Sequence, residues 1–262
     1  MSGDFAFSLG PYAFLVIAFL ITLGFTGLGF VIGKRLGPPK NDLQAAALNT
    51  ALASIFVIVG LILSFSFSFA VTRYEERWHL VVAEADAIST TYLRMGELEP
   101  KDREAARSAM RAYISAKIDY HRNGSDLALA QLDYQKIRAL EQQIWSITAG
   151  ELSSRPVPAT SLITQSVNAM FDVGADQRAA LGFRLRGPAL GLIVFVSLIA
   201  AFMVGLGFGQ SQSLHWLVSV TFSLVLVALM YAIIDLDSPQ AGLIRVNLLP
   251  LEQAQQTMLQ EP

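Results

Sequence analysis

The side chains of this sequence that could carry acid–base or metal chemistry include three histidines. His79, His121 and His215 lie far apart and do not have the spacing of metal ligands. The sequence has no cysteine, which excludes thiol nucleophiles and thiolate metal sites. It also lacks the G-x-S-x-G, P-loop and H-E-x-x-H motifs. We therefore expect no catalytic site, no metal site and no cofactor, so the protein is not expected to be an enzyme.

A different kind of chemistry, control over the passage of ions, is indicated by one apolar row. Large apolar side chains recur there every four residues: Val57, Leu61, Phe65 and Phe69. Ser64 and Ser68 lie beside the row, and Asn49 adds a polar group nearer the other end of the same helix. Large apolar side chains around a pore can close it by excluding water. The row could instead pack against a neighbouring helix or face lipid.

Charged residues follow the row directly and could select the ion. Arg73 and Arg77 continue the four-residue spacing beyond Phe69, and they would favour anions if they faced a pore axis. Glu76, with Glu75 beside it, would favour cations from the same place. The simplest alternative is that these charges are solvated or paired with one another on a helix outside the membrane.

Four long apolar runs must position these residues. They cover residues 11–33, 44–71, 187–208 and 214–234. Each reaches the roughly 20 residues that a helix needs to cross about 30 Å of hydrocarbon. Glycines within two of them suit the close approach of helices in lipid: Gly24, Gly27, Gly29, Gly205 and Gly207. The sequence therefore predicts an all-α, polytopic membrane protein.

The charges divide this protein into segments. Thirty of the 40 Lys, Arg, Asp and Glu residues lie between residues 73 and 186, where the pattern is helical. We expect a first membrane hairpin over 1–71, a helical insert over 72–186, a second hairpin over 187–235 and a tail over 236–262. No basic patch or stripe of the kind that binds nucleic acid is present.

Orientation in the membrane depends on Lys and Arg residues close to the spans. Six lie on the side of the insert: Arg73, Arg77, Arg178, Arg184, Arg186 and Arg245. Three lie on the other side: Lys34, Arg35 and Lys40. The larger number favours a cell (inner) membrane protein with its insert and both termini in the cytoplasm.

Several short motifs resemble those of the bacterial bestrophin-like family, which is distantly similar to the bestrophin anion channels. They are Asn41-Asp42, Arg73-Tyr74-Glu75-Glu76, Glu84-Ala85, Asn168-Ala169-Met170 and the segment from Leu236 to Arg245. The resemblance implies a homo-oligomer, a pentamer in bestrophins, that conducts small anions such as chloride. It also implies a pore lined by the second span, with a narrow apolar neck at Val57, Leu61 and Phe65.

Two departures from the family pattern limit what is carried over. Animal bestrophins bind calcium with a dense acidic cluster after the last span, whereas only Asp235 and Asp237 stand here. Ca²⁺ takes six or more oxygen ligands, so we expect no calcium site. The Asn-Pro-Phe-Gly of bestrophins reads Ser-Pro-Gln-Ala-Gly over residues 238–242.

The expected function is an oligomeric ion channel whose partners are membrane lipid, further copies of the chain and small inorganic ions. One alternative is a non-conducting membrane scaffold or sensor whose helical insert binds a cytoplasmic partner. A second alternative is a channel that conducts cations, because the apolar row carries no charge that specifies the sign of the ion.

Overall fold

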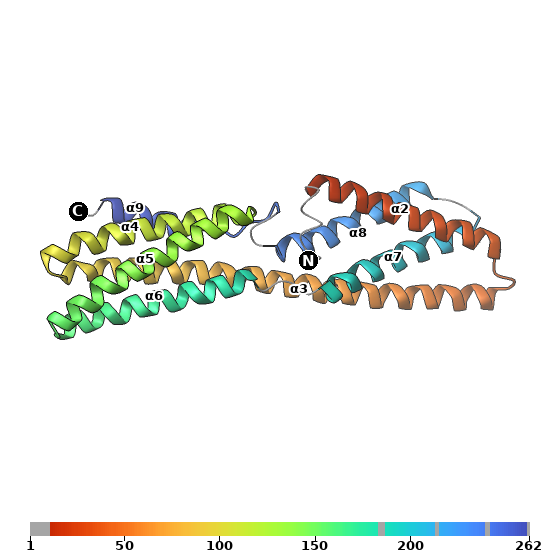
Figure 1. The fold of residues 1–262 in the computed structure, drawn as a ribbon. Helices are drawn as coiled ribbons and strands as arrows, with labels where there is room; N and C mark the ends of the chain where they lie inside the picture. Colours follow the sequence, from red (N-terminus) through yellow and green to blue (C-terminus); the bar gives the residue numbers. More distant parts are fainter. Residues whose placement is uncertain (1–10, 183–186, 213–214, 239–241, 261–262) are drawn as a thin grey trace. The chain divides into compact units, whose positions relative to one another are not determined.

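The computed structural model describes residues 11–182, 187–212, 215–238 and 242–260, and the regular elements of this part are all helices (Figure 1). They are α2 (Pro11–Leu36), α3 (Asp42–Arg94), the short 3₁₀ helix η1 (Met95–Glu97), α4 (Pro100–Arg122), α5 (Leu127–Ser154), α6 (Pro158–Gly182), α7 (Gly187–Gln210), α8 (Trp216–Leu236) and α9 (Leu249–Gln260). Four helical stretches are long and apolar enough to cross a membrane: Tyr12–Leu36, Asp42–Glu97, Pro158–Gln210 and Trp216–Leu236. The predicted all-α fold with four spans is thus confirmed.

The chain forms two compact units. The membrane unit consists of Met1–Arg73, Arg184–Ser238 and Gly242–Ile244. The helical unit consists of Tyr74–Phe183, Pro239–Ala241 and Arg245–Pro262. Helix α3 contributes residues to both, because it continues without a break past the end of the second span.

In the membrane unit, α2 and α7 touch through their backbones. A Cβ atom on Gly29 would overlap the carbonyl group of Phe202, and one on Gly205 would overlap that of Thr26. Gly33 and Gly209, one helical turn further along, meet the backbones of Leu206 and Phe30 in the same way. These pairings advance together along both helices, so α2 and α7 run parallel. Glycine is required here because it alone lets two backbones approach this closely.

Three of the glycines expected to serve this purpose make no such contact within the chain. A Cβ on Gly24 or Gly27 would have no neighbour within 4 Å, and one on Gly207 would meet only the side chain of Leu52 at 3.6 Å. Within the chain these positions meet no neighbouring helix backbone, and composition does not reveal which side of a helix meets its partner. Spacing was the available signal, since Gly29 and Gly33, like Gly205 and Gly209, are four residues apart and share one face.

One side of the membrane part of α3 packs against its own chain. Val59, Leu63 and Ala70 are buried on this side. The ring of Phe56 lies 6.2 Å from the ring of Phe222 on α8. Helix α3 is therefore held by one side, which leaves the opposite side free for other contacts.

The helical unit has an apolar core built from the end of α3 together with α4, α5, α6 and the tail. Its fully buried side chains include Ile88, Tyr92, Met110, Ile114, Ile144, Val167, Met170 and Leu251. Helix α9 in the tail was not predicted. Its buried residues Leu251, Ala254 and Met258 have helical spacing, and the Tyr92 hydroxyl donates to the Met258 carbonyl at 3.0 Å.

A buried ion pair lies within this core. The ammonium group of Lys117 on α4 is 2.6 Å from a carboxylate oxygen of Glu84 on α3, and both side chains are 0% exposed. A Cβ added to Gly174 on α6 would lie 3.2 Å from both the Glu84 carboxylate and the Tyr113 hydroxyl. Burial, and then the charge of Glu84, raise the pKa of Tyr113, which keeps this hydroxyl protonated.

Next to the ion pair, His121 contacts the side-chain amide of Gln177 on α6. Burial, and then the positive charge of Lys117, lower the pKa of His121 to about 3. The imidazole is therefore neutral in the folded protein over the physiological pH range.

Candidate functional site

The apolar row of α3 lies on the side of the helix that its own chain leaves uncovered. Val57, Leu61, Phe65 and Phe69 are 70%, 54%, 57% and 61% exposed. Ser64, Ser68 and Asn49 are exposed as well. Because the opposite side of α3 is buried, the row is available to lipid, to another copy of the chain or to a pore.

The two arginines after the row are engaged within their own units. In the membrane unit, Arg73 forms an ion pair with Asp237, with 2.7 Å between the guanidinium and carboxylate atoms. In the helical unit, Arg77 is only 3% exposed, and its Nε donates to the Ala180 carbonyl at 3.3 Å. Glu75 and Glu76 are exposed instead. That Arg73 and Arg77 face the axis of a pore stays a prediction.

Helix geometry explains why Arg77 leaves the row. An α-helix turns about 100° per residue, so each four-residue step overshoots a full turn by about 40°. Between Leu61 and Arg77 these steps add up to about 160°, which places the two side chains on nearly opposite sides of an ideal helix. Glu76 is only about 60° from Leu61 by the same measure. Four-residue spacing therefore describes a common face over two or three turns and fails over longer distances.

The segment after α8 is anchored by a buried acid that sequence reasoning did not single out. The Asp235 carboxylate accepts hydrogen bonds from the Tyr231 hydroxyl at 2.9 Å and from the backbone N–H groups of Leu243 and Ile244 at 2.9 and 2.7 Å. Gly242 has a φ of +131°, and a Cβ there would overlap this carboxylate. Asp235 thus fixes the backbone just after Gly242, and Asp235 and Asp237 are both engaged by donors of their own chain.

Some residues used in the sequence analysis lie outside the described part of the chain. Arg184 and Arg186 contribute to the predicted orientation, and residues 239–241 belong to the segment that differs from bestrophins. The structure bears on neither expectation through these residues.

Fold and site together define a class of protein: an all-α membrane protein with four candidate spans, whose second span continues into a helical unit and exposes an apolar row. The bestrophin-like domain matches residues 19–251 of the sequence. The chain belongs to the bestrophin-like family.

Solved structures show the same fold. A bacterial bestrophin homologue from Klebsiella pneumoniae superposes with a TM-score of 0.68 at 12% identity, over 94% of this chain and 96% of the other. A single-substitution variant from the same organism has a TM-score of 0.65 at 11% identity, over 94% of this chain and 98% of the other. A further structure, described as a membrane protein variant, has a TM-score of 0.71 at 11% identity, over 94% of this chain and 97% of the other. No curated protein matches the sequence.

Proposed function

We propose that this chain assembles into a homo-oligomeric ion channel, a pentamer by resemblance to bestrophins, with a pore lined by the exposed side of α3. Membership of the bestrophin-like family supports a channel in general terms. The observation that carries the pore assignment is the two-sided character of α3 in the membrane unit. On one side Val59, Leu63 and Ala70 are buried and Phe56 lies against Phe222 of α8, while the side with the apolar row is exposed.

In this proposal Val57, Leu61 and Phe65 form the neck, a narrow apolar part of the pore in which each residue contributes one ring of side chains. The rings act as a gate because water leaves an apolar constriction readily, and a dehydrated ion does not pass. Phe69 continues the gate at one end. Ser64 and Ser68 give polar contacts beside it, and the exposed amide of Asn49 lies near the opposite entrance.

The sign of the permeant ion separates two candidates. The anion preference expected from the resemblance depends on Arg73 and Arg77 facing the axis. The engagement of Arg73 with Asp237 and the burial of Arg77 favour the second candidate, a cation channel, because Glu75 and Glu76 are the exposed charges after the row. A ring of carboxylates at a pore mouth attracts cations.

The natural absence of cysteine provides a direct test of the pore. Leu61→Cys and Phe65→Cys introduce single thiols on the exposed side, while Val59→Cys and Leu63→Cys place matched thiols on the buried side of the same helix. Ion flux is measured in liposomes before and after a charged, water-soluble thiol reagent. We expect the reagent to change flux through the first two variants and not through the controls.

Each alternative has its own signature in this experiment. No flux from folded, oligomeric protein, together with thiols at 61 and 65 that do not react with the reagent, would leave the non-conducting scaffold as the better account. Reversal potentials in a salt gradient identify the sign of the ion. If carboxylates select cations, Glu75→Gln with Glu76→Gln reduces the cation preference, whereas Arg73→Gln in an anion channel reduces the anion preference.

The proposed location is the cell membrane, with the insert and both termini in the cytoplasm. A single cysteine at Lys40 tests this orientation, because an impermeant reagent added to intact cells should label it. A cysteine at exposed Glu104 in the helical unit should stay unlabelled until the membrane is opened.

A further inference from the structure

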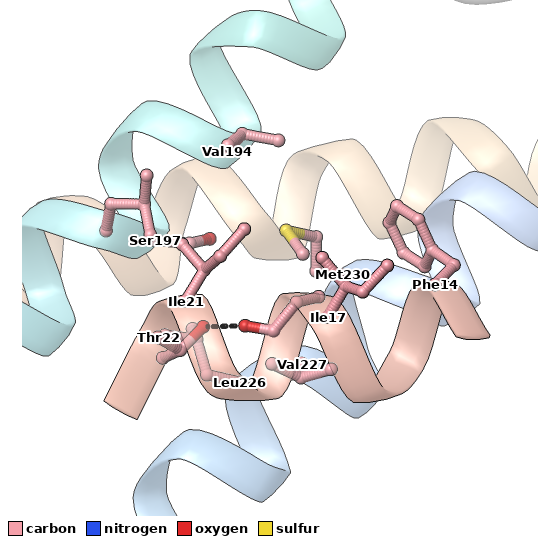
Figure 2. Close-up of a pocket in the computed structure, with 11 residues that line it drawn as sticks. Phe14, Ile17, Ile21, Thr22, Val194, Ser197, Leu226, Val227 and Met230 are labelled. Atoms are coloured by element: carbon pink, nitrogen blue, oxygen red, sulfur yellow. Dashed lines mark hydrogen bonds between the residues drawn. The ribbon is translucent and has the colours of Figure 1, made fainter. Parts of the chain in front are cut away.

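Three membrane helices enclose an apolar pocket that the proposed ion pathway does not use. It lies in the membrane unit between α2, α7 and α8 and has a volume of about 130 Å³. Figure 2 shows Ile17 and Ile21 of α2, Val194 of α7, and Met230 of α8 among its lining side chains. The pocket is separate from the exposed row of α3, which contributes no lining residue.

The chemistry of the lining favours an apolar occupant. Only Thr22 and Ser197 of the lining residues carry a hydroxyl group, and both donate to their own helix. The Thr22 hydroxyl bonds the Ala18 carbonyl at 2.7 Å, marked by the dashed line in Figure 2, and the Ser197 hydroxyl bonds the Ile193 carbonyl at 2.8 Å. A buried water needs two to four polar partners, and apolar cavities of about 150 Å³ stay dry and take apolar molecules. The pocket therefore suits a hydrocarbon.

The pocket opens towards the surface that α2 presents to the bilayer. Its inner wall is buried, with Val227 and Met230 only 4% and 7% exposed. Its rim is open, with Ile17 and Ile21 43% and 47% exposed. Other exposed side chains of α2, such as Leu20, are also apolar, as expected where a span faces hydrocarbon. The pocket is thus continuous with the lipid-facing surface of the span.

The depth of the pocket identifies the leaflet that supplies its occupant. Its α2 residues run from Phe14 to Thr22, close to the start of α2, a rise of about 12 Å at 1.5 Å per residue. Its α8 residues run from Leu226 to Met230, in the second half of α8. We propose that the pocket binds a segment of one acyl chain of a phospholipid in the leaflet where α2 begins and α8 ends. The acyl segment fills the pocket, so the lining side chains gain dispersion contacts that they would lack around an empty space.

A photoreactive lipid tests this proposal on the full-length protein in liposomes. Phosphatidylcholine with a diazirine on its acyl chain is irradiated, and the labelled peptides are mapped by mass spectrometry. In the wild type we expect labelling of Val227 and Met230 that exceeds, by several-fold, what their small exposure predicts relative to exposed Leu28. Labelling that follows exposure alone at all three positions would overturn the proposal, since it would reflect random lipid contact.

Filling the pocket provides the second measurement. Ala18→Leu with Ser197→Leu adds side-chain volume to the inner wall, and Val16→Leu adds it to an exposed position outside the pocket. We expect the filled variant to lose most of the labelling at Val227 and Met230 while Leu28 keeps its labelling, and Val16→Leu to behave as wild type. Unchanged labelling in a filled, folded variant would overturn the proposal.

If the filled variant does not fold, a fluorescent reporter replaces it. Phe14→Trp places an indole at the pocket and Tyr12→Trp places one at an exposed site of the same helix. Lipids brominated along the acyl chain should quench the fluorescence of the Phe14→Trp variant at least as strongly as that of the Tyr12→Trp variant, although Phe14 is the less exposed position. Weaker quenching at Phe14 would mean that the pocket is closed to lipid, for example by a second copy of the chain.

Discussion

The ion pair between Glu84 and Lys117 should be the most sensitive polar contact of the helical unit. Both side chains are fully buried, with 2.6 Å between the charged atoms. Replacing one partner leaves the other as an unpaired charge in the core. Breaking a buried pair in this way costs about 3–5 kcal/mol, whereas replacing both partners by apolar residues of similar size is often neutral. We expect Lys117→Met to lower the free energy of unfolding by this full amount. The double variant, Glu84→Met with Lys117→Met, should recover most of the lost stability.

Thermal unfolding in detergent measures the effect. For a domain or chain of this size, 1 kcal/mol corresponds to about 2–4 °C in Tm, so Lys117→Met should unfold about 6–20 °C below the wild type. The scan rate must be held constant, because apparent Tm values of membrane proteins depend on it when unfolding is irreversible.

The exposed pair between Arg122 and Glu252 is the matched control. Its atoms lie 2.7 Å apart, but its side chains are 60% and 36% exposed, and such pairs contribute about 0–1 kcal/mol. If Lys117→Met lowered Tm no more than Arg122→Met, the reasoning from burial would be refuted. If the double variant at Glu84 and Lys117 were as unstable as the single one, the cost would come from packing and not from charge.

Three further predictions follow from the same structure. Replacing all three neck residues by alanine should raise ion flux in liposomes if they form a hydrophobic gate; unchanged flux would place the gate elsewhere. Gly205→Ala should destabilise the protein by at least about 2 kcal/mol, because its methyl group would overlap a backbone carbonyl, whereas Gly24→Ala should be neutral or stabilising in the same thermal assay. The pKa of His121 is about 3 in the fold and about 6.5 in the unfolded chain, so the stability it contributes is complete above pH 6.5 and is lost as the pH falls towards 3. From this group alone the free energy of unfolding should be about 3 kcal/mol lower at pH 4 than at pH 7.5; His121→Gln should weaken this dependence, and His79→Gln should not.

The fold was predictable because the bilayer imposes a strong pattern on sequence. Residues 5–33, 43–72 and 187–234 contain no charged side chain, and such stretches have few structural solutions other than membrane helices. The continuation of α3 beyond the membrane also has a local cause, because no proline or glycine interrupts the sequence between Arg73 and Arg94.

The site was less predictable, because a pattern in one chain does not state what a helix face meets. The sequence pattern of the row from Val57 to Phe69 is the same whether these side chains face lipid, a neighbouring copy or a pore. The burial of Arg77 depends on the accumulated turn of the helix and on the position of Ala180, about one hundred residues later in the chain. The role of Asp235 depends on the backbone N–H groups of Leu243 and Ile244, which only the folded chain brings to this carboxylate.

The glycine contact between α2 and α7 has a consequence for biosynthesis. Gly29 and Gly205 belong to different hairpins, and the whole helical insert is translated between them. At about 5–20 residues per second, α7 follows α2 by roughly 10–35 s. During this interval Gly29 and Gly33 have no α7 backbone to pack against. The contact between α2 and α7 therefore cannot form until the second hairpin has been made, so the membrane unit is completed only after the whole insert has been translated.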